Sequence, residues 1–600
     1  MKRKNRVGKK WMALLTALTV CGSMLAGCGG AQGTGSTSEA DAGTAADAGT
    51  AADAGSGDAF SFDSVSDVTF PLEEKLTFTV FVYATTTGGG TYQDNYVTDW
   101  IEEKTNIHLD FVYDVDGDDA KTKLNLVMTD PDSMPDIFLT TGWTKSEVQS
   151  YGQQGLLLPL NEYLEDAPNW NKMAEECPAM KADLTMSDGN IYTFGDVNEC
   201  FHCRYQHRMY IYMPWVESLN DGKIPETTEE LYDFLVKVKN EDPNGNGIAD
   251  EIPMTGFLGG WSTDPTVWMI NSFVQCNNPL SNTNPTVGAG LVVNDGTIEY
   301  SVMKEEYRDA LRYMNRLYKE GLLDNQTFTQ DNTQFSATLK NEDAHLVAMY
   351  PAGGPQVDDE FWTNMDGEWQ DWEVIEPVAG PDGVRLAAKG TDNYFGSCIG
   401  SISKNCQYPE IAVALFDMLM SEEGTNVQQF GPEGVGWDWV SDGTSLAGGT
   451  PTYQKYTIPE DYDWLGNGWE KEYPDKHRTW AADASIRCNT ARYRGEMKTE
   501  DPAHDTEYYL QAAAEKYSQY DPGDDTIVPN LVFEGQDAQT ISEGTLTIGG
   551  YVNQATVQFI TGDLDVETDW DGYLSQLKDM GVENYLAIYQ KYYDAYMENM

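Results

Sequence analysis

Strand and helix patterns alternate in the first part of the chain, and this order restricts the fold most strongly. Apolar and polar residues alternate at the start of Leu76–Val82, and three glycines, Gly88–Gly90, follow this segment. This is the pattern expected of a first strand that ends in a loop. The pattern continues with a helix over Tyr96–Lys104, a strand over Ile107–Tyr113, a helix over Lys121–Met128 and a strand over Pro135–Leu139. Because such an order is typical of α/β folds, we predict a mainly parallel sheet.

The chain has 600 residues, which exceeds the usual size of one domain and favours two lobes. Ligands approach parallel sheets at the carboxyl ends of the strands. This rule makes Tyr83, and Trp143 in the turn Thr140–Trp143, candidate ligand-binding residues.

The first 28 residues have the pattern of a bacterial lipoprotein signal. Six basic residues up to Lys10 precede the apolar stretch Trp11–Val20, and the segment ends in Leu25-Ala26-Gly27-Cys28. The apolar stretch is too short for a permanent membrane helix, and the last four residues look like a lipobox. We expect residues 1–27 to be removed as a signal peptide and Cys28 to carry the lipid. An ordinary secretory signal with a chance cysteine is the alternative.

Residues 28–69 are expected to join the lipid to the globular part as a tether. Up to about Ala59 they consist mainly of Gly, Ala, Ser, Thr and Asp, with a short repeat that begins at Asp41, Asp47 and Asp53. Such a composition cannot bury enough apolar surface to offset the entropy of ordering, so we predict a flexible segment.

The chain is strongly acidic, with 97 Asp and Glu residues, 38 Lys and Arg residues and a formal charge of −59. This charge argues against nucleic acid as a partner and against electrostatic binding to anionic lipid. The acyl group would then be the only membrane anchor. We expect an extracytoplasmic monomer on the outer face of the bacterial cell membrane.

The segment Asp242–Pro253 follows a predicted helix over Thr228–Lys239 and has the spacing of a calcium-binding loop. Side-chain oxygens recur at every second position, and a glycine stands sixth, where an EF-hand-type loop needs a sharp turn. The predicted ligands are the side chains of Asp242, Asn244, Asn246, Asp250 and Glu251 and the carbonyl of Ile248. Pro253 takes the place of the usual bidentate glutamate, so Glu251 would replace it. Since one loop supplies all ligands, the ion would be structural; a turn without metal is the alternative.

Nine cysteines include Cys21 in the signal and Cys28 at its end, and the remaining seven cannot all pair. Cys200-Phe201-His202-Cys203 has a spacing that could bind zinc, but the sequence contains no second Cys-x-x-Cys pair. We expect a local disulfide or free thiols at this motif.

Further motifs resemble those of the large extracellular solute-binding proteins of carbohydrate ABC transporters. The matching segments are Thr227–Leu235 and Ile252–Gly256 around the calcium loop, Leu156–Leu164, Asp188–Phe194, Asn393–Ser397, Ile402–Asn405, Pro409–Gly424 and Gln429–Trp439. Tyr210–Val216 departs from the family pattern Arg-x-Asp-Trp, of which only Trp215 remains. The resemblance covers most of residues 75–440.

The resemblance implies a two-lobed type II periplasmic-binding-protein-like fold with a hinge and a ligand cleft between the lobes. We expect the chain to cross near residues 192–200 and 390–400. The N-terminal lobe would comprise residues 70–195 and 395–435. The C-terminal lobe would comprise residues 196–394 and 436–600, including the calcium loop 242–253. The implied partners are an oligosaccharide and the permease subunits of an ABC transporter, and no catalysis is expected.

Sugars are recognised by aromatic rings that stack on their C–H faces and by hydrogen bonds to their hydroxyls. The chain contains 16 Trp and 34 Tyr residues, and most aromatic residues in proteins belong to cores. Besides Tyr83 and Trp143, the candidates are Trp261, Trp437 and Trp439 in glycine-rich loops, Tyr350 before a Pro-Ala-Gly turn and Tyr394 at the second expected crossing.

Two other functions are open to the chain, a secreted, lipid-anchored glycoside hydrolase and a surface adhesin that holds glycan. Carboxylates are so abundant that some pair will always have the separation of a hydrolase pair. The sequence contains no Gly-x-Ser-x-Gly, His-Glu-x-x-His or phosphate-binding glycine motif, so hydrolase, zinc protease and nucleotide functions lack positive support.

Overall fold

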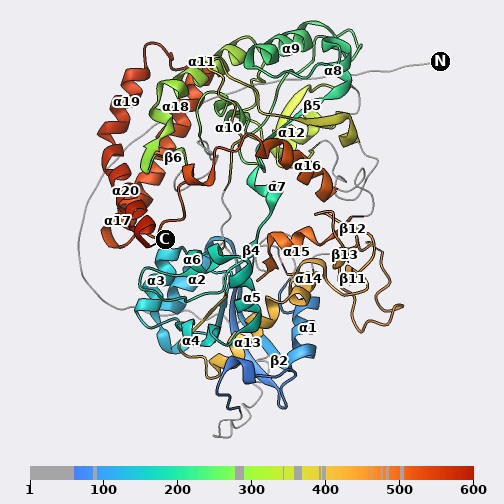
Figure 1. Cartoon of the computed structure of the whole chain (residues 1–600), viewed down its shortest axis with the longest axis vertical. Coiled ribbons are helices and arrows are strands. Elements are labelled where there is room, and N and C mark those ends of the chain that lie inside the picture. Colours follow the sequence, from blue (N-terminus) through green and yellow to red (C-terminus); the bar gives the residue numbers. More distant parts are fainter. Residues whose placement is uncertain are drawn as a thin grey trace, which may run out of the picture. The chain divides into compact units, whose positions relative to one another are not determined.

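The computed structural model of the protein describes residues 60–84, 91–276, 289–341, 344–356, 368–390, 394, 400–459, 461–474, 477–480, 486–499 and 506–599 (Figure 1). The chain divides into two compact units, Met1–Asp58 and Ala59–Met600, and the described residues belong to the second. The predicted signal peptide, Cys28 and most of the predicted tether lie outside the described residues. No helix in the described part of the chain is long and apolar enough to cross a membrane.

The first of two hydrophobic cores surrounds a four-stranded sheet in the order β10-β3-β1-β2. The central strand β1 (Leu76–Ala84) pairs in parallel with β2 (Ile107–Asp116) and with β3 (Ile137–Leu139). A late segment, β10 (Gly400–Ile402), adds an antiparallel edge strand beside β3. The mainly parallel sheet predicted from the sequence is confirmed, and a distant part of the chain completes it.

Helices from two separate stretches of the chain cover this sheet, drawn in blue to teal and in amber to orange in Figure 1. They are α1 (Tyr96–Thr105), α2 (Gly117–Thr129), α3 (Lys145–Gln153), α4 (Asn161–Leu164), α5 (Pro168–Glu176), α6 (Pro178–Leu184), α13 (Pro409–Leu419), α14 (Glu422–Phe430) and α15 (Ala491–Gly495). Local signals fix their ends: the Asn95 side chain caps α1, and Asn106 ends it with a left-handed φ of 59°. Thr144 and Glu147 form a capping box that starts α3.

The second core surrounds an antiparallel sheet in the order β8-β5-β9. Its strands are β5 (Arg208–Tyr212), β8 (Met349–Ala352) and β9 (Trp372–Ile375). The Tyr210 and Tyr350 rings face each other across β5 and β8, with centroids 5.2 Å apart and planes 11° from parallel. This cross-strand stack and the buried Trp372 make the sheet a rigid support.

Eleven helices belong to or flank the second core in the described part of the chain. They are α7 (Phe201–Arg204), α8 (Met213–Asn220), α9 (Thr228–Asn240), α10 (Pro265–Ile270), α11 (Glu305–Lys319), α12 (Asn332–Leu339), α16 (Thr506–Ser518), α17 (Gly535–Gly544), α18 (Gly550–Thr561), α19 (Trp570–Asp579) and α20 (Val582–Asn599). A π-helical turn over Thr545–Gly549 joins α17 to α18. The hairpin of β6 (Leu291–Asn294) and β7 (Thr297–Tyr300) packs beside α20.

The chain passes between the two cores three times. The first passage follows β4 (Val197–Asn198), the second lies between Ala387 and Tyr394, and the third lies between Met497 and Leu510. β4 pairs in parallel with β14 (Cys488–Asn489), so segments next to the first and third passages lie side by side. The sequence did not indicate the third passage.

The third passage divides the segment 436–600, which we expected to lie wholly in the C-terminal lobe. Residues from Trp437 to Met497 pack in the first core, and residues from Leu510 to Tyr593 pack in the second. Aromatic packing holds the earlier part: the Trp480 ring contacts Tyr92, and the Trp469 ring contacts Tyr96. Short strand pairs stiffen it, namely β11 (Trp437–Trp439) with β13 (Tyr453–Lys455) and β12 (Thr444–Ser445) with β15 (Lys498–Thr499).

Direct hydrogen bonds also join the two cores away from the passages. Ser146 Oγ donates to the Phe533 carbonyl at 2.7 Å, and Gln149 Nε2 donates to Glu534 Oε1 at 2.9 Å. Ser187 Oγ donates to the same carboxylate oxygen. These bonds lower the pKa of Glu534, because donors from Ser187 and Gln149 favour its charged form.

Candidate functional site

The seven aromatic candidates differ in exposure. Tyr83 lies in β1, but its side chain is outside the described residues. Trp143, Tyr350, Tyr394 and Trp437 are buried in the cores, whereas Trp261 and Trp439 are each 40% exposed. Of the six candidates whose side chains the structure describes, only these last two present a large part of their ring to solvent.

Core contacts account for the four buried rings. Trp143 packs between Phe138 and Tyr151, Tyr350 stacks on Tyr210, Tyr394 donates its hydroxyl to Glu199 Oε1, and Trp437 donates Nε1–H to the Gly431 carbonyl. In this chain, glycines next to an aromatic residue in the sequence therefore do not predict whether its ring is exposed or buried.

Trp261 is held in one orientation although much of its ring is exposed. Its Nε1–H donates to Gln206 Oε1 at 2.7 Å, and its carbonyl accepts a hydrogen bond from the Gly353 N–H at 2.9 Å. The ring lies directly against Gly353, because a Cβ added there would stand only 2.1 Å from Trp261 Cε2. An exposed aromatic face fixed in this way is the geometry that stacks on a flat apolar ligand surface.

Trp439 is held more loosely. It lies at the end of β11, opposite Tyr453, and its ring meets Trp437 edge-on at 5.0 Å. Its segment packs in the first core, whereas the segment that carries Trp261, from Phe257 to Trp268, packs in the second. The two exposed tryptophans thus come from different cores.

Two basic residues, His207 and Arg208, stand at the start of β5, next to the Gln206 that holds Trp261. Arg208 is fully buried and donates hydrogen bonds to the carbonyls of His202 and Gly353. His207 Nδ1 is also buried and has no hydrogen-bond partner among the described residues. Burial, together with the neighbouring Arg208 charge, lowers the pKa of His207 to about 4, so its imidazole is neutral at pH 7.

A largely buried ionic cluster joins the first and third passages. Glu507, in the first turn of α16, lies 3.1 Å from His202 Nε2 and 3.1 Å from Arg494 Nη2. Burial opposes ionisation of Glu507, but the hydrogen bond from His202 and the charge of Arg494 outweigh it and hold its pKa well below the ordinary range. Arg494 also donates to Asn198 Oδ1 at 3.1 Å, so the cluster spans both cores.

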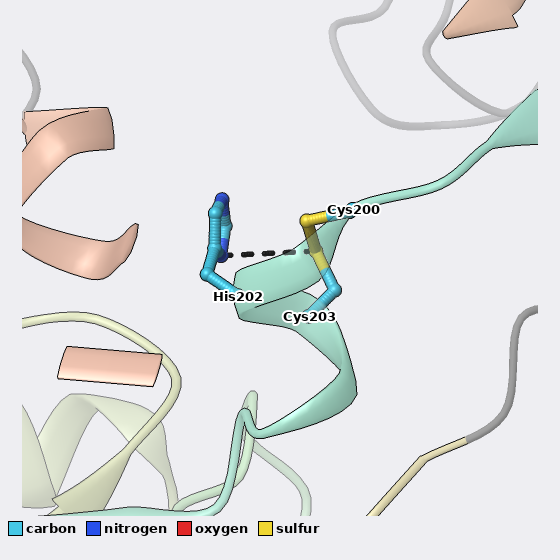
Figure 2. Close-up of side chains that lie close together, drawn as sticks. All are labelled: Cys200, His202 and Cys203. Atoms are coloured by element: carbon cyan, nitrogen blue, oxygen red, sulfur yellow. Dashed lines mark hydrogen bonds between the residues drawn. A yellow bond between two sulfur atoms is a disulfide. The ribbon is translucent and has the colours of Figure 1, made fainter. Parts of the chain in front are cut away.

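The Cys200–Cys203 motif forms a local disulfide, one of the two states expected from the sequence. Figure 2 shows the His202 ring beside this disulfide, with Nδ1 3.8 Å from Cys203 Sγ. These three residues are also the one cluster of His, Cys, Asp or Glu in the described part of the chain that could hold a metal. Because disulfide sulfurs are not thiolates, they do not ligate zinc in this state.

The loop Asp242–Pro253 follows α9, whose predicted extent is confirmed within one residue. Gly245 and Gly247 adopt left-handed φ values of 71° and 76°, which let the loop turn sharply. Gly247 N–H donates to Asp242 Oδ2 at 3.0 Å, and Ile248 N–H donates to Asn246 Oδ1 at 2.6 Å. The side chains therefore curl toward the inside of the loop.

The polar side chains of this loop form hydrogen bonds with one another. The amides of Asn244 and Asn246 both lie 3.1 Å from the Asp250 carboxylate, and Glu251 Oε1 is buried with no partner among the described residues. A buried carboxylate oxygen without a donor is costly, and a bound cation would satisfy it. The Ile248 side chain is 61% exposed, which agrees with the prediction that this residue would bind the ion through its backbone carbonyl.

The sequence did not indicate Gln206, Arg208 or Gly353, which together position Trp261. The one available signal was Arg208 itself, a charged residue at the start of the otherwise aromatic and apolar run Met209–Tyr212. A charged residue inside such a run needs partners, but sequence alone does not show which carbonyls supply them.

Comparison with known proteins identifies the family. The family model described as bacterial extracellular solute-binding protein matches residues 83–426. The chain belongs to this family. A known relative, the fructooligosaccharide ABC transporter substrate-binding protein FusA of Streptococcus pneumoniae serotype 4, is 26% identical over 554 residues, which cover 89% of this chain and 93% of FusA.

Solved structures agree on the fold. A FusA EF-hand mutant of S. pneumoniae in complex with fructo-nystose matches with a TM-score of 0.67 at 21% identity, covering 87% of this chain and 100% of that chain. An HMO-binding, ABC-transporter-associated solute-binding protein from Bifidobacterium longum infantis matches with a TM-score of 0.69 at 19% identity, covering 87% and 99%. This solute-binding protein therefore has the two-lobed type II fold, and the proteins it resembles are extracellular binding proteins rather than enzymes.

Proposed function

We propose that this solute-binding protein captures an oligosaccharide, without changing it chemically, and delivers it to an ABC permease. The observation that carries the proposal is the fixed, exposed ring of Trp261. An aromatic ring that needs no reorientation can stack on the apolar face of a sugar at a small cost in entropy. The relative FusA, named for fructooligosaccharide, makes fructose oligomers the first ligands to test.

The two lobes would close on the ligand by bending at the three passages. Trp261 would contribute from the second core and Trp439 from the first. Only a few residues need to change φ and ψ in such a closure, and the ligand shifts the population toward the closed form. The remaining candidates, Tyr83, Trp143, Tyr350, Tyr394 and Trp437, would then support the site or become accessible in another conformation.

Titration calorimetry with a panel of oligosaccharides tests this function, with chromatography of the recovered ligand. Trp261→Ala should weaken binding of the sugar that the panel selects by about 1–3 kcal/mol, by analogy with stacked bases. Leu465→Ala, which truncates a side chain that is 54% exposed, is the control and should bind as the wild type does. Cleaved sugar would show a hydrolase instead, and binding of a peptide but no sugar would show that the ligand class is wrong.

Transport distinguishes the proposed function from a glycan adhesin. Deletion of the gene should abolish uptake of the selected sugar while leaving uptake of unrelated sugars unchanged. If the sugar binds but uptake continues unchanged, the adhesin becomes the better explanation. The protein should also elute as a monomer in size-exclusion chromatography, with and without sugar.

We also propose that Asp242–Pro253 binds a structural calcium ion and that Cys28 carries a lipid. The calcium proposal is supported by the side-chain oxygens of Asp242 and Asn246, which face N–H groups of their own loop, and by the buried Glu251 Oε1. It is also consistent with the EF-hand of FusA, which the solved mutant alters. The lipid proposal rests on the sequence alone; the acyl group would anchor the protein to the outer face of the cell membrane.

A further inference from the structure

Arg208 has an unusual environment for a charged residue. It is the first residue of β5, its side chain is fully buried, and it forms no ion pair with any described residue. Its guanidinium donates Nη1–H to the Gly353 carbonyl and Nη2–H to the His202 carbonyl, while Nε has no partner in the described part of the chain. Burying a cation without a counter-ion is costly, so its two hydrogen bonds must contribute strongly to the local structure.

The partners of Arg208 lead directly to Trp261. Arg208 N–H donates to the Gln206 carbonyl at 2.9 Å, and the Gln206 side chain accepts from Trp261 Nε1–H at 2.7 Å. The Trp261 carbonyl accepts from Gly353 N–H at 2.9 Å, and the Gly353 carbonyl accepts from Arg208. Four hydrogen bonds therefore form a closed circuit through Arg208, Gln206, Trp261 and Gly353.

The second guanidinium bond connects this circuit to the first passage. It ends on the carbonyl of His202 in α7, and the ring of His202 contacts Glu507 at 3.1 Å. Glu507 in turn binds Arg494 of the other core at 3.1 Å. A planar guanidinium holds two carbonyls in a fixed relation, which a flexible ammonium cannot do.

We propose that Arg208 is a positioning residue that fixes the Trp261 ring and ties its orientation to the first passage between the lobes. Arg208 itself touches no ligand. It acts by holding Gly353 and α7, so that the ring stands ready in the ligand-free protein. The consequence for binding rests on the proposed function of Trp261 as a stacking surface, whereas the consequence for the position of the ring does not.

Fluorine NMR of the protein labelled with 5-fluorotryptophan tests the position of the ring without any ligand. The resonance of residue 261 is assigned as the one that Trp261→Phe removes. Arg208→Lys keeps the charge but lacks the planar guanidinium that holds two carbonyls at once, so it should shift or broaden this resonance. The matched control is Arg478→Lys, because Arg478 is also a buried arginine whose guanidinium donates to three backbone carbonyls, those of Tyr473, Ile458 and Pro459.

A second variant keeps the test decisive if Arg208→Lys does not fold. Gln206→Ala removes the acceptor of Trp261 Nε1–H but leaves the guanidinium in place, and it should move the same resonance. An unchanged 261 resonance in Gln206→Ala, or in a folded Arg208→Lys, overturns the proposal. A shift of equal size in Arg478→Lys also overturns it, since the effect would then follow from the loss of any buried arginine.

Affinity for the selected oligosaccharide provides the second readout. Arg208→Lys should weaken binding by about tenfold, within the range that loss of one stacking contact produces, and should add little to Trp261→Ala because both act on one ring. Full additivity of the two variants would contradict the proposal. If no oligosaccharide binds, the proposed function fails, but the ligand-free NMR result still decides the role of Arg208.

Discussion

Replacing Gly353 with alanine should displace the Trp261 ring without removing it. The variant therefore tests whether binding depends on where the ring stands. The added Cβ would lie 2.1, 2.3 and 2.6 Å from Cε2, Cδ2 and Nε1 of Trp261, whereas carbon atoms in contact normally stand about 3.5–4.0 Å apart. The ring must therefore move by more than about 1 Å. Because 40% of Trp261 is exposed, it can turn into solvent, and this movement would break its bond to Gln206.

The expected magnitudes for Gly353→Ala differ between folding and binding. Loss of the hydrogen bond to Gln206 would destabilise the protein by about 0.5–1.5 kcal/mol. The lower entropy of the unfolded alanine chain offsets about 0.4–1 kcal/mol of this, so the free energy of unfolding should change by less than about 1 kcal/mol. Binding should lose about 1–3 kcal/mol, the value of the stacking contact.

Calorimetry with the oligosaccharide selected by the panel, together with thermal unfolding, measures both quantities. Gly550→Ala is the matched control, because no heavy atom lies within 4 Å of an added Cβ at that glycine. If Gly353→Ala binds as the wild type does while Trp261→Ala does not, the close approach of Gly353 does not determine the position of the ring. If both variants bind as the wild type does, Trp261 is not part of the binding surface.

Four further perturbations have defined outcomes. Asp242→Ala combined with Asp250→Ala should lower the melting temperature in calcium and abolish its sensitivity to chelator. If chelator leaves the melting temperature of the wild type unchanged, the loop binds no structural metal. Burial raises the pKa of Asp264 to about 6, so its stabilising contribution is complete below its unfolded pKa and is lost as pH rises through 6. The stability of Asp264→Asn relative to wild type should therefore rise by up to about 3 kcal/mol between pH 4 and pH 8 in urea unfolding, and a constant difference would refute this. Cys28→Ser should release the protein from membranes into the medium, as judged by fractionation, whereas retention would exclude the lipid anchor. Glu534→Ala removes an acceptor shared by Gln149 and Ser187 and should enlarge the ligand-free radius of gyration in small-angle scattering; an unchanged radius would show that these bonds do not hold the lobes together.

The sequence predicted the first sheet well because its signals are local. The strands and helices from Leu76 to Leu139 alternate with short loops, and the structure places β1, α1, β2, α2 and β3 close to the predicted bounds. The sharp turn after α9 was also visible, since the positions of Gly245 and Gly247 are a property of twelve consecutive residues. Local patterns do not show which distant segment completes a core, and for this reason the packing of Trp437–Met497 in the first core was not predicted.

The exposure of aromatic residues was the least predictable property of the candidate site. Trp437 and Trp439 stand two apart in β11, so the strand period places both on the same side. Trp437 is nevertheless fully buried while Trp439 is 40% exposed, because Trp437 lies over the first core and Trp439 lies at the end of the strand. Trp261 depends on Gly353, which is far away in sequence, and no periodicity could reveal that contact.

The three passages between the cores also determine when the chain can fold during its synthesis. Chains emerge from the ribosome with the N-terminus first, and the first core lacks Trp437–Met497 until most of the chain has been made. The second core lacks Leu510–Tyr593 until almost the last residue. Neither core is therefore complete until late in the synthesis of the chain. Late completion of this kind suits a polypeptide whose predicted export signal must direct it across a membrane before it folds.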